Sequence, residues 1–379
     1  EKSRGYLMKK IGIVGAGISG LVLACFLKKN KNYEISVYEK DDIYLPNSNG
    51  IQISPNALRI LKKINFDLFN QKKLCKITGL SFYDYNLNAK IARMSFDYLK
   101  NDPYITLNRN ELINFLINQF SLKDNIILKE VTNINDKSIF FKNNSEEKFD
   151  TLVVADGIFS KLRPEKIQPV YSGYSALRGV FTDTIQVNDI DLWMGKNFHL
   201  VKYPIDQNKN FSFTLVKKMP FVKVVDGYDS KFKDINKNNN FYFPRFDNMT
   251  FDNTKVKIWP IYKLNKIFYG HNDIYFIGDS AHGFIPSRAQ GAAQAIEDSY
   301  ALYNFLKQNE SCTKKLYKFR KNRIKKIITK SENNLTIFHL NIFMFRWIRN
   351  LIIKLICSYE FLIKFVNSSI FDYKIKEDL

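Results

Sequence analysis

The stretch Lys10–Gly20, KIGIVGAGISG, constrains the fold of this chain more than any other. A short apolar run of strand type leads into three glycines with G-x-G-x-x-G spacing, Gly15, Gly17 and Gly20. An apolar helical pattern follows at once. The first glycine permits a tight turn, the second lets a pyrophosphate approach the backbone, and the third lets helix and strand pack closely. The pattern therefore predicts a strand–turn–helix unit that binds a dinucleotide at the helix N-terminus.

A second strand-type run supports this interpretation. Residues Glu34–Tyr38 are followed by Glu39, which lies about 20 residues past the glycines, where a carboxylate accepts hydrogen bonds from ribose hydroxyls. The alternative is that the glycines only form a turn in an ordinary strand–helix unit. We expect the dinucleotide site.

The length and charge of the chain limit the number of domains and the kinds of partner that we expect. With 379 residues, 45% of them hydrophobic, it predicts two or three domains or one large interleaved domain. The formal net charge of +21 comes from lysines spread over the whole chain, and the sequence contains no compact basic motif or zinc-finger spacing. We therefore expect no nucleic-acid partner.

The thiols and the terminal residues predict the compartment. The chain has four cysteines and no C-x-x-C pair: Cys25, Cys75, Cys312 and Cys357. We expect reduced thiols and a cytoplasmic protein. Glu1–Leu7 precede Met8 and are interpreted as an upstream extension. No stretch holds 18 uncharged apolar residues, so the sequence predicts no transmembrane helix.

Strand patterns dominate the middle of the chain. Gly79–Phe96 reads as a hairpin with a turn at Asn86–Asn88, and residues 169–257 read as a second, mostly antiparallel sheet. Between these segments the sequence predicts three more strands, the first two joined through Asn133–Lys137. Their ranges are Ile126–Glu130, Ser138–Phe141 and Phe149–Ala155.

Helical patterns flank the strands. Ser54 and Pro55 read as the N-cap and first residue of a helix, and an apolar face begins at Arg109. A helix rich in small residues is expected over about 290–308, and the tail Leu316–Val366 reads as helical throughout.

Two further motifs carry candidate chemistry. In TLVVADGIFSKLR, Asp156 and Gly157 follow a buried strand, and Arg163 is close enough in sequence to neutralise a phosphate or to lie on the surface. In IYFIGDSAHGFIP, a strand again ends in Gly-Asp, here with Asp279, which can accept hydrogen bonds from a polyol. His282 is expected to be a partly buried histidine with its hydrogen bonds satisfied.

These three motifs together resemble the signatures of a known family. The glycine turn with Glu39, DGIFSKLR and GDSAHGFIP are similar to the motifs of the single-component (class A) FAD-dependent aromatic monooxygenases, which have the p-hydroxybenzoate hydroxylase fold. GIQISPNALRIL, YSALRG, HLVKYP and AQGAAQAIED are closest to the salicylate hydroxylase-like branch. The resemblance runs from Lys10 to about Leu302 and extends weakly into the tail.

The resemblance implies the cofactors and their ligands. FAD would be the bound cofactor, and NADH or NADPH would bind transiently, because the chain has no second glycine-rich strand–helix motif. The implied FAD-binding residues are Gly15, Gly17, Ile18, Ser19, Gly20, Glu39, Lys40, Arg109, Asp156, Gly157, Gly278, Asp279, Pro286, Gly291 and Ala292.

The resemblance also implies an α/β fold in which a Rossmann-like FAD-binding domain is interleaved with a mixed or antiparallel substrate-domain sheet, followed by a helical C-terminal tail. The expected FAD-binding segments are 8–78, 101–168 and 266–310. The expected substrate-domain segments are 79–100 and 169–265, and 311–379 would form the tail.

One strand carries the candidate catalytic pair. In FHLVKYPI, His199 and Tyr203 are four residues apart and so point to the same face of a strand. Such a pair can face the substrate in the salicylate hydroxylase-like branch. A histidine with a pKa near about 6.5 is suited to take the proton of a phenol. The alternative is that His199 is a packing residue. Arg178 meets either a substrate carboxylate or a surface acid.

The activity implied is hydroxylation of a phenolic or aromatic-acid small molecule with NAD(P)H and O2, through a flavin C4a-hydroperoxide. Two alternatives stay open within enzymes: a membrane-associated hydroxylase of a quinone precursor, and an epoxidase on the same scaffold. An alternative from another class is an FAD-bound redox sensor without turnover.

The tail allows two interpretations. Ile337–Val366 is rich in apolar residues interrupted by charges, which is typical of an amphipathic helix resting on a membrane surface. We expect instead a pair of helices packed on the FAD domain or at a dimer contact. The chain is then a monomer or a homodimer.

Overall fold

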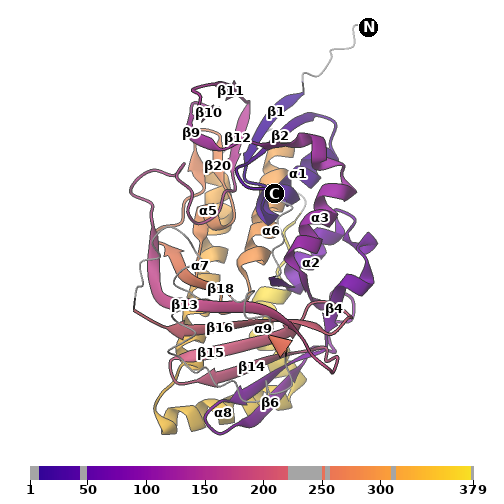
Figure 1. Cartoon of the computed structure of the whole chain (residues 1–379), viewed down its shortest axis with the longest axis vertical. Coiled ribbons are helices and arrows are strands. Elements are labelled where there is room, and N and C mark those ends of the chain that lie inside the picture. Colours follow the sequence, from indigo (N-terminus) through magenta and orange to yellow (C-terminus); the bar gives the residue numbers. More distant parts are fainter. Residues whose placement is uncertain (1–7, 43–48, 221–249, 252–256, 309–312, 377–379) are drawn as a thin grey trace.

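Two β-sheets at opposite ends of the molecule organise the fold, with helices between and around them (Figure 1). The computed structural model describes residues 8–42, 49–220, 250–251, 257–308 and 313–376. The predicted upstream extension and Cys312 lie outside these residues. The other three cysteines are free thiols.

The six-stranded sheet carries the glycine turn. Its strand order is β19-β20-β12-β1-β2-β8, parallel except for β19. Both faces are covered, so the central strands are almost continuously apolar. The bounds are β1 (Lys9–Val14), β2 (Tyr33–Glu39), β8 (Ile126–Leu128), β12 (Thr151–Val154), β19 (Gly270–His271) and β20 (Ile274–Phe276).

Four helices pack with this sheet. The helix after the glycine turn, α1, is buried along nearly its whole length because α3 and α6 lie against it. The small residues that begin α6 permit this close packing. The bounds are α1 (Ile18–Lys28), α3 (Arg109–Gln119), α5 (Asp279–His282) and α6 (Gly291–Lys307).

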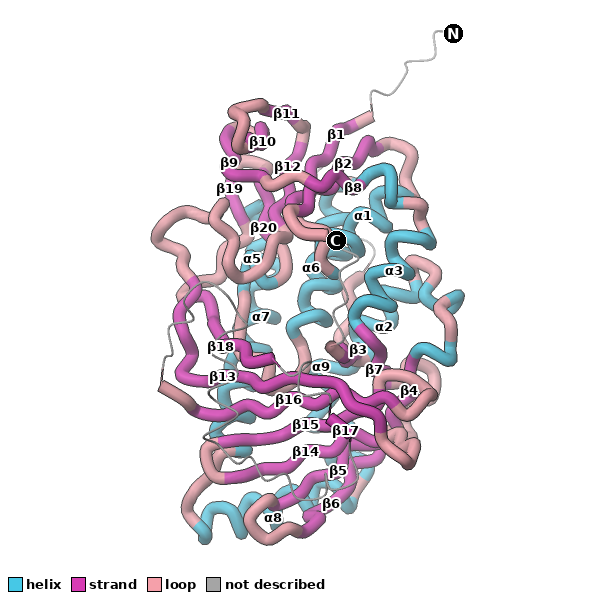
Figure 2. Tube along the Cα trace, in the orientation of Figure 1, coloured by secondary structure: helices cyan, strands magenta, loops and turns pink. Residues whose placement is uncertain are grey.

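The larger sheet crosses the lower half of the molecule in Figure 2. Its order is β17-β13-β16-β15-β14-β5-β6, with β18 also paired to β13. All neighbours are antiparallel except β5 and β14, so the sheet is mixed. The expected hairpin is β5–β6. The bounds are β5 (Gly79–Asp84), β6 (Ala89–Ser95), β13 (Pro169–Thr182), β14 (Asp189–Gly195), β15 (Phe198–Pro204), β16 (Asn210–Lys218), β17 (Thr250–Phe251) and β18 (Lys257–Leu264).

Two small sheets complete the strands, and one corrects the sequence analysis. Only Ile126–Leu128 of the predicted strand Ile126–Glu130 form a strand, β8. The next segment was predicted as a connection and instead forms a separate strand. The exposed, charged β11 was missed because it has no apolar alternation. The bounds are β3 (Gly50–Ile53), β4 (Leu74–Ile77) and β7 (Tyr104–Asn108) in one sheet, and β9 (Val131–Asn135), β10 (Ser138–Phe141) and β11 (Glu146–Lys148) in the other.

The helix α2 (Pro55–Lys62) begins where the sequence predicts. Ser54 occupies the N-cap position, but its hydroxyl donates to Oδ1 of Asn56 at 2.6 Å instead of accepting from the backbone. Short 3-10 turns follow at η1 (Phe66–Leu68), η2 (Gln71–Lys73) and η3 (Leu122–Asn125).

The tail is three helices, α7 (Thr313–Phe338), α8 (Phe343–Ser358) and α9 (Glu360–Phe371). α7 packs against α6, whereas α8 packs against β6 of the larger sheet and α9 against α2 and β6. The expectation that the last two helices pack on the dinucleotide domain is therefore wrong for α8. Among the helices described, none has the length and apolarity needed to cross a bilayer.

The overall fold class is as predicted: a Rossmann-like α/β half interleaved with a mixed sheet and followed by C-terminal helices. Strands of the six-stranded sheet come from the segments 8–78, 101–168 and 266–310, and strands of the larger sheet from 79–100 and 169–265. We propose these segments as the two domains, with 311–379 as the tail.

Candidate active site

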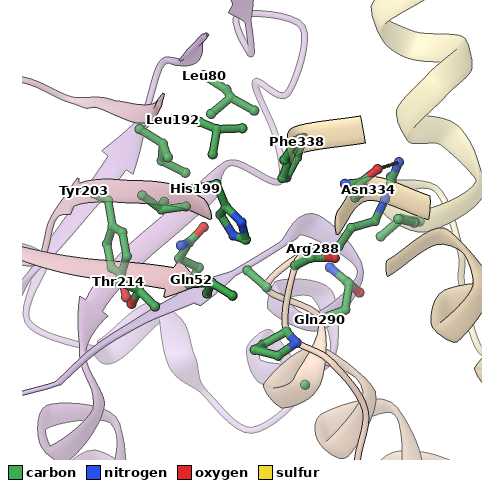
Figure 3. Close-up of a pocket in the computed structure, with 18 of the residues that line it drawn as sticks. Gln52, Leu80, Leu192, His199, Tyr203, Thr214, Arg288, Gln290, Asn334 and Phe338 are labelled. Carbon is green, nitrogen blue, oxygen red and sulfur yellow. Dashed lines mark hydrogen bonds between the residues drawn. The ribbon is translucent and has the colours of Figure 1, made fainter. Parts of the chain in front are cut away.

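A cavity of about 1070 Å³ lies between the two halves of the fold. Gly17, Asp279 and Gly291 line it from the six-stranded half, and His199 and Tyr203 line it from the larger sheet. Figure 3 shows its inner part, with apolar side chains on one side and amide and guanidinium groups on the other.

The glycine turn is shaped by close backbone approach. Gly15 has φ +105°, and a Cβ there would lie 2.5 Å from the carbonyl oxygen of Ala155. A Cβ on Gly20 would lie 2.0 Å from the carbonyl oxygen of Gly15, so strand and helix touch there. A Cβ on Gly17 would meet nothing nearer than 3.9 Å, so this glycine leaves open space on the cavity side.

The first turn of α1 presents free polar groups. No side chain caps its N-terminus among the described residues, and the buried hydroxyl of Ser19 has no hydrogen-bond partner there. Both Ile18 and Ser19 line the cavity. Glu39 is held beside the turn because its Oε2 accepts from the backbone N–H of Ala16 at 2.8 Å, and Oε1 accepts from that of Lys40 at 2.9 Å.

Two arginines and a carboxylate meet at the cavity wall. Burial and the positive charge of Arg178 lower the pKa of Arg109, while Glu39 and Asp279 oppose that shift. Burial raises the pKa of Asp279, and His282 and Arg109 counteract it. Arg109, Arg178 and Asp279 all line the cavity. The two neighbouring cations favour an anion between them.

The motif that follows β12 contains Asp156, Gly157 and Arg163, and Arg163 lies differently from its prediction. Gly157 lines the cavity with φ +86°, and Asp156 beside it is exposed. Arg163 is buried and donates to the carbonyl oxygens of Ser280 at 3.0 Å and Ile158 at 2.6 Å. It is thus neither a phosphate ligand nor a surface arginine, and both predictions for it are wrong. It ties two cavity loops together.

The Gly-Asp motif after β20 is fixed from behind. Gly278 has φ +65°, and its N–H donates to Oδ2 of Asp298 at 2.9 Å. His282 is buried, with Nε2 2.6 Å from the same carboxylate oxygen. Burial raises the pKa of Asp298, but His282 and Arg320 outweigh it and hold the value at about 2. His282 is fully rather than partly buried, and its Nδ1 has no hydrogen-bond partner among the described residues, so the predicted satisfied histidine is only half correct.

A buried ion cluster supports this arrangement. Arg320 of α7 donates to Glu297 and Asp298 of α6, at 2.7 Å in each case, and Arg323 adds a 2.9 Å bond to Glu297. All four side chains are nearly excluded from solvent. Asn56 of α2 donates to Glu297 at 2.6 Å, so the cluster joins three helices behind the cavity. Sequence reasoning missed its two arginines, which sit in a lysine-rich stretch.

The loop before α6 brings backbone to the cavity. Pro286, Gly291 and Ala292 line it, and a Cβ on Gly291 would have nothing within 4 Å. Ala289 has φ +51°, a left-handed conformation that costs a non-glycine residue energy and is typical of functional sites. No side chain caps the start of α6 among the residues described, so its first N–H groups face this space.

On the larger sheet, His199 and Tyr203 share the cavity face of β15, as their spacing predicts. His199 is 2% exposed, and its Nδ1 lies 2.8 Å from Nε2 of His339, at the end of α7. Burial lowers the pKa of His199 to about 3 and that of His339 to about 4. The expected pKa near about 6.5 is therefore wrong.

The pairing of the two rings indicates which nitrogens carry protons. Nδ1 of His339 is buried and has no hydrogen-bond partner among the described residues. If His339 donates through Nε2–H, its Nδ1 carries no hydrogen and is only an unused acceptor. In the other tautomer Nδ1 carries the hydrogen, and burying that N–H group without a partner costs more free energy. The first arrangement leaves His199 with its proton on Nε2, the ring nitrogen left for the cavity.

The remaining cavity wall was mostly unrecognised in the sequence. Tyr203 packs on Gly50, where a Cβ would lie 2.7 Å from its ring, and the Tyr104 hydroxyl donates to Gln52 at 2.9 Å. Arg288 donates to Asn334 at 3.0 Å (Figure 3). Nε of Arg178 and of Arg288 is buried without a partner in the described parts of the chain. The missed residues are Gln52, Tyr104, Arg288, Gln290, Asn334 and His339.

Comparison with known proteins finds relatives and a domain model that resemble this chain. The model of the NAD(P)-binding Rossmann-like domain matches residues 13–44. The 3-amino-4-hydroxybenzoate 2-monooxygenase of Streptomyces platensis is 24% identical over 78% of this chain and 79% of its own. The 6-hydroxynicotinate 3-monooxygenase of Pseudomonas fluorescens is 24% identical over 79% and 83%. The chain is therefore similar to the class A flavoprotein monooxygenases.

Solved structures agree at the level of the fold. HpxO of Klebsiella pneumoniae, in complex with FAD and uric acid, superposes with a TM-score of 0.74 at 18% identity, covering 95% of this chain and 99% of its own. A salicylate hydroxylase substrate complex gives 0.74 at 16% identity, covering 97% and 96%. The named relatives are monooxygenases, which favours an oxidoreductase over the alternative of a sensor without turnover.

The residues that line the cavity of this chain fit a flavin dinucleotide. The open space at Gly17 and Gly291, the unpaired Ser19 hydroxyl and the uncapped starts of α1 and α6 all face one cavity. Of the predicted FAD-binding set, those lining the cavity are Gly17, Ile18, Ser19, Arg109, Gly157, Asp279, Pro286, Gly291 and Ala292. The others lie just behind or beside the lining: Gly15, Gly20, Glu39, Lys40, Asp156 and Gly278.

Proposed function

We propose that this chain binds FAD and hydroxylates a small phenolic or aromatic-acid compound with NAD(P)H and O2. One observation carries the proposal: a single cavity joins the glycine turn and the start of α6 to an apolar sheet face that bears His199 and Tyr203. In the overall reaction one oxygen atom of O2 enters the ring, the other leaves as water, and NAD(P)H with a proton supplies the two electrons.

The six-stranded half would hold the cofactor. The backbone at Gly17 and the N–H groups of α1 would bind its pyrophosphate, with Arg109 adding positive charge. Glu39 would accept from the adenosine ribose, and Asp279 from the ribityl chain. Reduced flavin, when bound, supplies the activation of O2. The backbone over residues 286–292 would lie against its ring system and keep water away from it.

The wall of the larger sheet defines the substrate class. Leu80, Leu192 and Phe338 form an apolar surface that suits the faces of an aromatic ring (Figure 3). Arg178 and Arg288 each carry a buried Nε without a partner among the described residues, and a carboxylate would satisfy such a group. The relatives act on hydroxylated aromatic or pyridine acids by their names, which agrees with this chemistry.

His199 would orient the ring hydroxyl rather than remove its proton. A group whose conjugate acid has a pKa of about 3 is a weak base towards a phenol, whose pKa is about 10. With Nε2–H facing the cavity, His199 would donate a hydrogen bond to the ring oxygen. Such a bond favours the ionised form of that oxygen, and the ionised oxygen pushes electron density into the ring that attacks oxygen.

The activity is tested by NAD(P)H oxidation with a panel of hydroxybenzoates and hydroxypyridine acids. We expect one class of compound to accelerate oxidation, with a product one oxygen atom heavier by mass spectrometry. Oxidation without a hydroxylated product, for every compound in the panel, contradicts the proposal. An epoxide product from an alkene would favour the epoxidase alternative, whose named relative from Spinacia oleracea is 27% identical to this chain.

The role of His199 has its own test. We expect His199→Phe to lower kcat/KM about 100-fold or more, as loss of a positioned hydrogen-bonding group does. The His199→Gln variant keeps an amide donor and should retain most of the activity. A general base would lose its function in both variants, so equal loss contradicts the donor assignment. Flavin absorbance of each variant reports whether the cofactor site is intact.

A further inference from the structure

The last two helices carry a concentrated exposed apolar surface. We call the outward side of α8 and α9 the tail face, and its large apolar side chains are between 41% and 76% exposed. Elsewhere in the described chain the exposed large apolar side chains are fewer in any one place, such as Ile185 with Val187. The members of the tail face are Phe343, Met344, Phe345, Trp347, Ile348, Leu351, Ile352, Leu355, Tyr359, Phe361 and Phe365.

The orientation of this face is fixed from the inside. Arg349 on the opposite side of α8 is buried and donates to Oδ2 of Asp84 at 3.2 Å, and Asn350 donates to the same oxygen at 3.1 Å. Ile363 and Ile370 of α9 are buried in the cluster under β6. The inward side of α8 thus combines Arg349 and Asn350 with Ile353 and Ile356, while most of its large apolar side chains face outward. α8 lies at the edge of the molecule, beyond β6 (Figure 1).

The tail face also borders the active-site cavity. Phe345, Ile348 and Ile352 line the cavity and are nevertheless 47%, 41% and 51% exposed. Because these side chains are in contact with both the cavity and solvent, the cavity opens to solvent on the tail face. A patch of this size on a water-soluble surface is typical of an interaction site.

The charges around the face identify its partner. Residues 342–366 contain four cations and one acid, Glu360, which pairs with Lys364. Arg346 and Lys354 remain beside the apolar side chains. In a symmetric dimer built on this face, the same cations would face each other, on a chain with net charge +21. Anionic lipid headgroups instead complement cations that flank aromatic and aliphatic side chains.

We propose that the tail face rests on the surface of an anionic lipid bilayer, with α8 and α9 lying in the plane of the headgroups. The apolar side chains enter the headgroup boundary, the cations contact lipid phosphates, and the cavity mouth faces the lipid. A phenolic compound dissolved in the bilayer then reaches the cavity without crossing water. Docking itself does not depend on the proposed activity.

The experiment is co-sedimentation of the full-length, flavin-loaded protein with vesicles of phosphatidylcholine containing phosphatidylglycerol, or of phosphatidylcholine alone. The tail variant Trp347→Ser/Leu355→Ser/Phe361→Ser changes side chains that do not line the cavity. The matched control is Leu68→Ser/Leu87→Ser/Leu128→Ser, which removes exposed apolar side chains elsewhere.

We expect the wild type and the control to partition onto the anionic vesicles, with at least tenfold weaker partitioning for the tail variant and for neutral vesicles. Equal partitioning of tail variant and wild type overturns the proposal, and so does failure of the wild type to bind. A stable dimer in analytical ultracentrifugation that the tail variant dissociates also overturns it, because a second copy then covers the face. These measurements need no substrate, so their failure is distinct from failure of the hydroxylase proposal.

Discussion

The two halves of the cavity wall present different chemistry. The six-stranded half offers mostly backbone: a glycine turn, a left-handed Ala289 and the uncapped starts of two helices. The larger sheet offers side chains, such as His199 and Tyr203 on one strand. A surface made of backbone depends on a few small residues and a precise scaffold, whereas a surface made of side chains can be changed one residue at a time. The first suits a constant cofactor and the second a particular substrate.

The scaffold behind the backbone half gives the largest predicted effect. Replacing Arg320 by Met leaves Glu297 and Asp298 buried without their main cation, so we expect a loss of roughly 3–5 kcal/mol in the free energy of unfolding. Urea denaturation measures it. Lys73→Met is the control, because its pair with Glu111 is solvent-exposed and worth less than about 1 kcal/mol. Similar losses for both variants would mean that the cluster does not hold the half together.

A pair of glycine variants separates packing from ligand approach. In Gly20→Ala the new methyl group meets the Gly15 carbonyl oxygen, and we expect a loss of about 1–3 kcal/mol in the free energy of unfolding. In Gly17→Ala it meets nothing nearer than 3.9 Å, so stability should change by less than about 1 kcal/mol. Flavin titration of the Gly17→Ala apoprotein should nevertheless show weakened binding. Unchanged flavin affinity in that variant would mean that pyrophosphate binding does not depend on close approach to the backbone at Gly17.

The side-chain half predicts a dependence of stability on pH. The pKa of His199 is about 3 and that of His339 about 4 in the folded chain, against about 6.5 when unfolded. Below about pH 6.5 the unfolded chain binds protons that the folded chain does not, so stability falls as pH is lowered toward 4. Each histidine contributes up to about 1.4 kcal/mol per pH unit in that range.

Urea midpoints of wild type and His199→Gln at pH 7 and pH 5 check this dependence. The variant should lose less stability between the two pH values than the wild type. His271→Gln, at an exposed position on β19, should behave as the wild type does. A wild type whose stability is the same at both pH values would contradict burial of neutral histidines.

The difference between features formed by consecutive residues and features formed by distant residues explains what could be predicted from the sequence. The glycine turn, its strand and its helix are consecutive in the chain, so one stretch of eleven residues is enough to recognise them. The shared face of His199 and Tyr203 follows from strand periodicity alone. Local patterns thus predicted the glycine turn and one face of β15, and the family resemblance carried by three such motifs predicted the fold class.

Long-range partners were beyond such reasoning. His339 meets His199 across 140 residues, and its contact changes the expected protonation of the candidate catalytic residue. Arg320 and Arg323 look like part of a solvated basic helix, yet they are buried against α6. Arg163 looked like a phosphate ligand because carbonyl partners leave no mark in a sequence. Each of these depends on how separate elements pack, which no local pattern encodes.

The order of strands in the six-stranded sheet has a consequence for synthesis on the ribosome. β12 pairs with β1 on one side and with β20 on the other, and β20 follows β12 in the chain by about 120 residues. At a translation rate of roughly 5–20 residues per second, β12 waits roughly 6–24 seconds for that last neighbour. During this interval an apolar strand edge stays open in the nascent chain, and the larger sheet is made in the meantime. Chaperone demand should therefore peak before Phe276 leaves the exit tunnel.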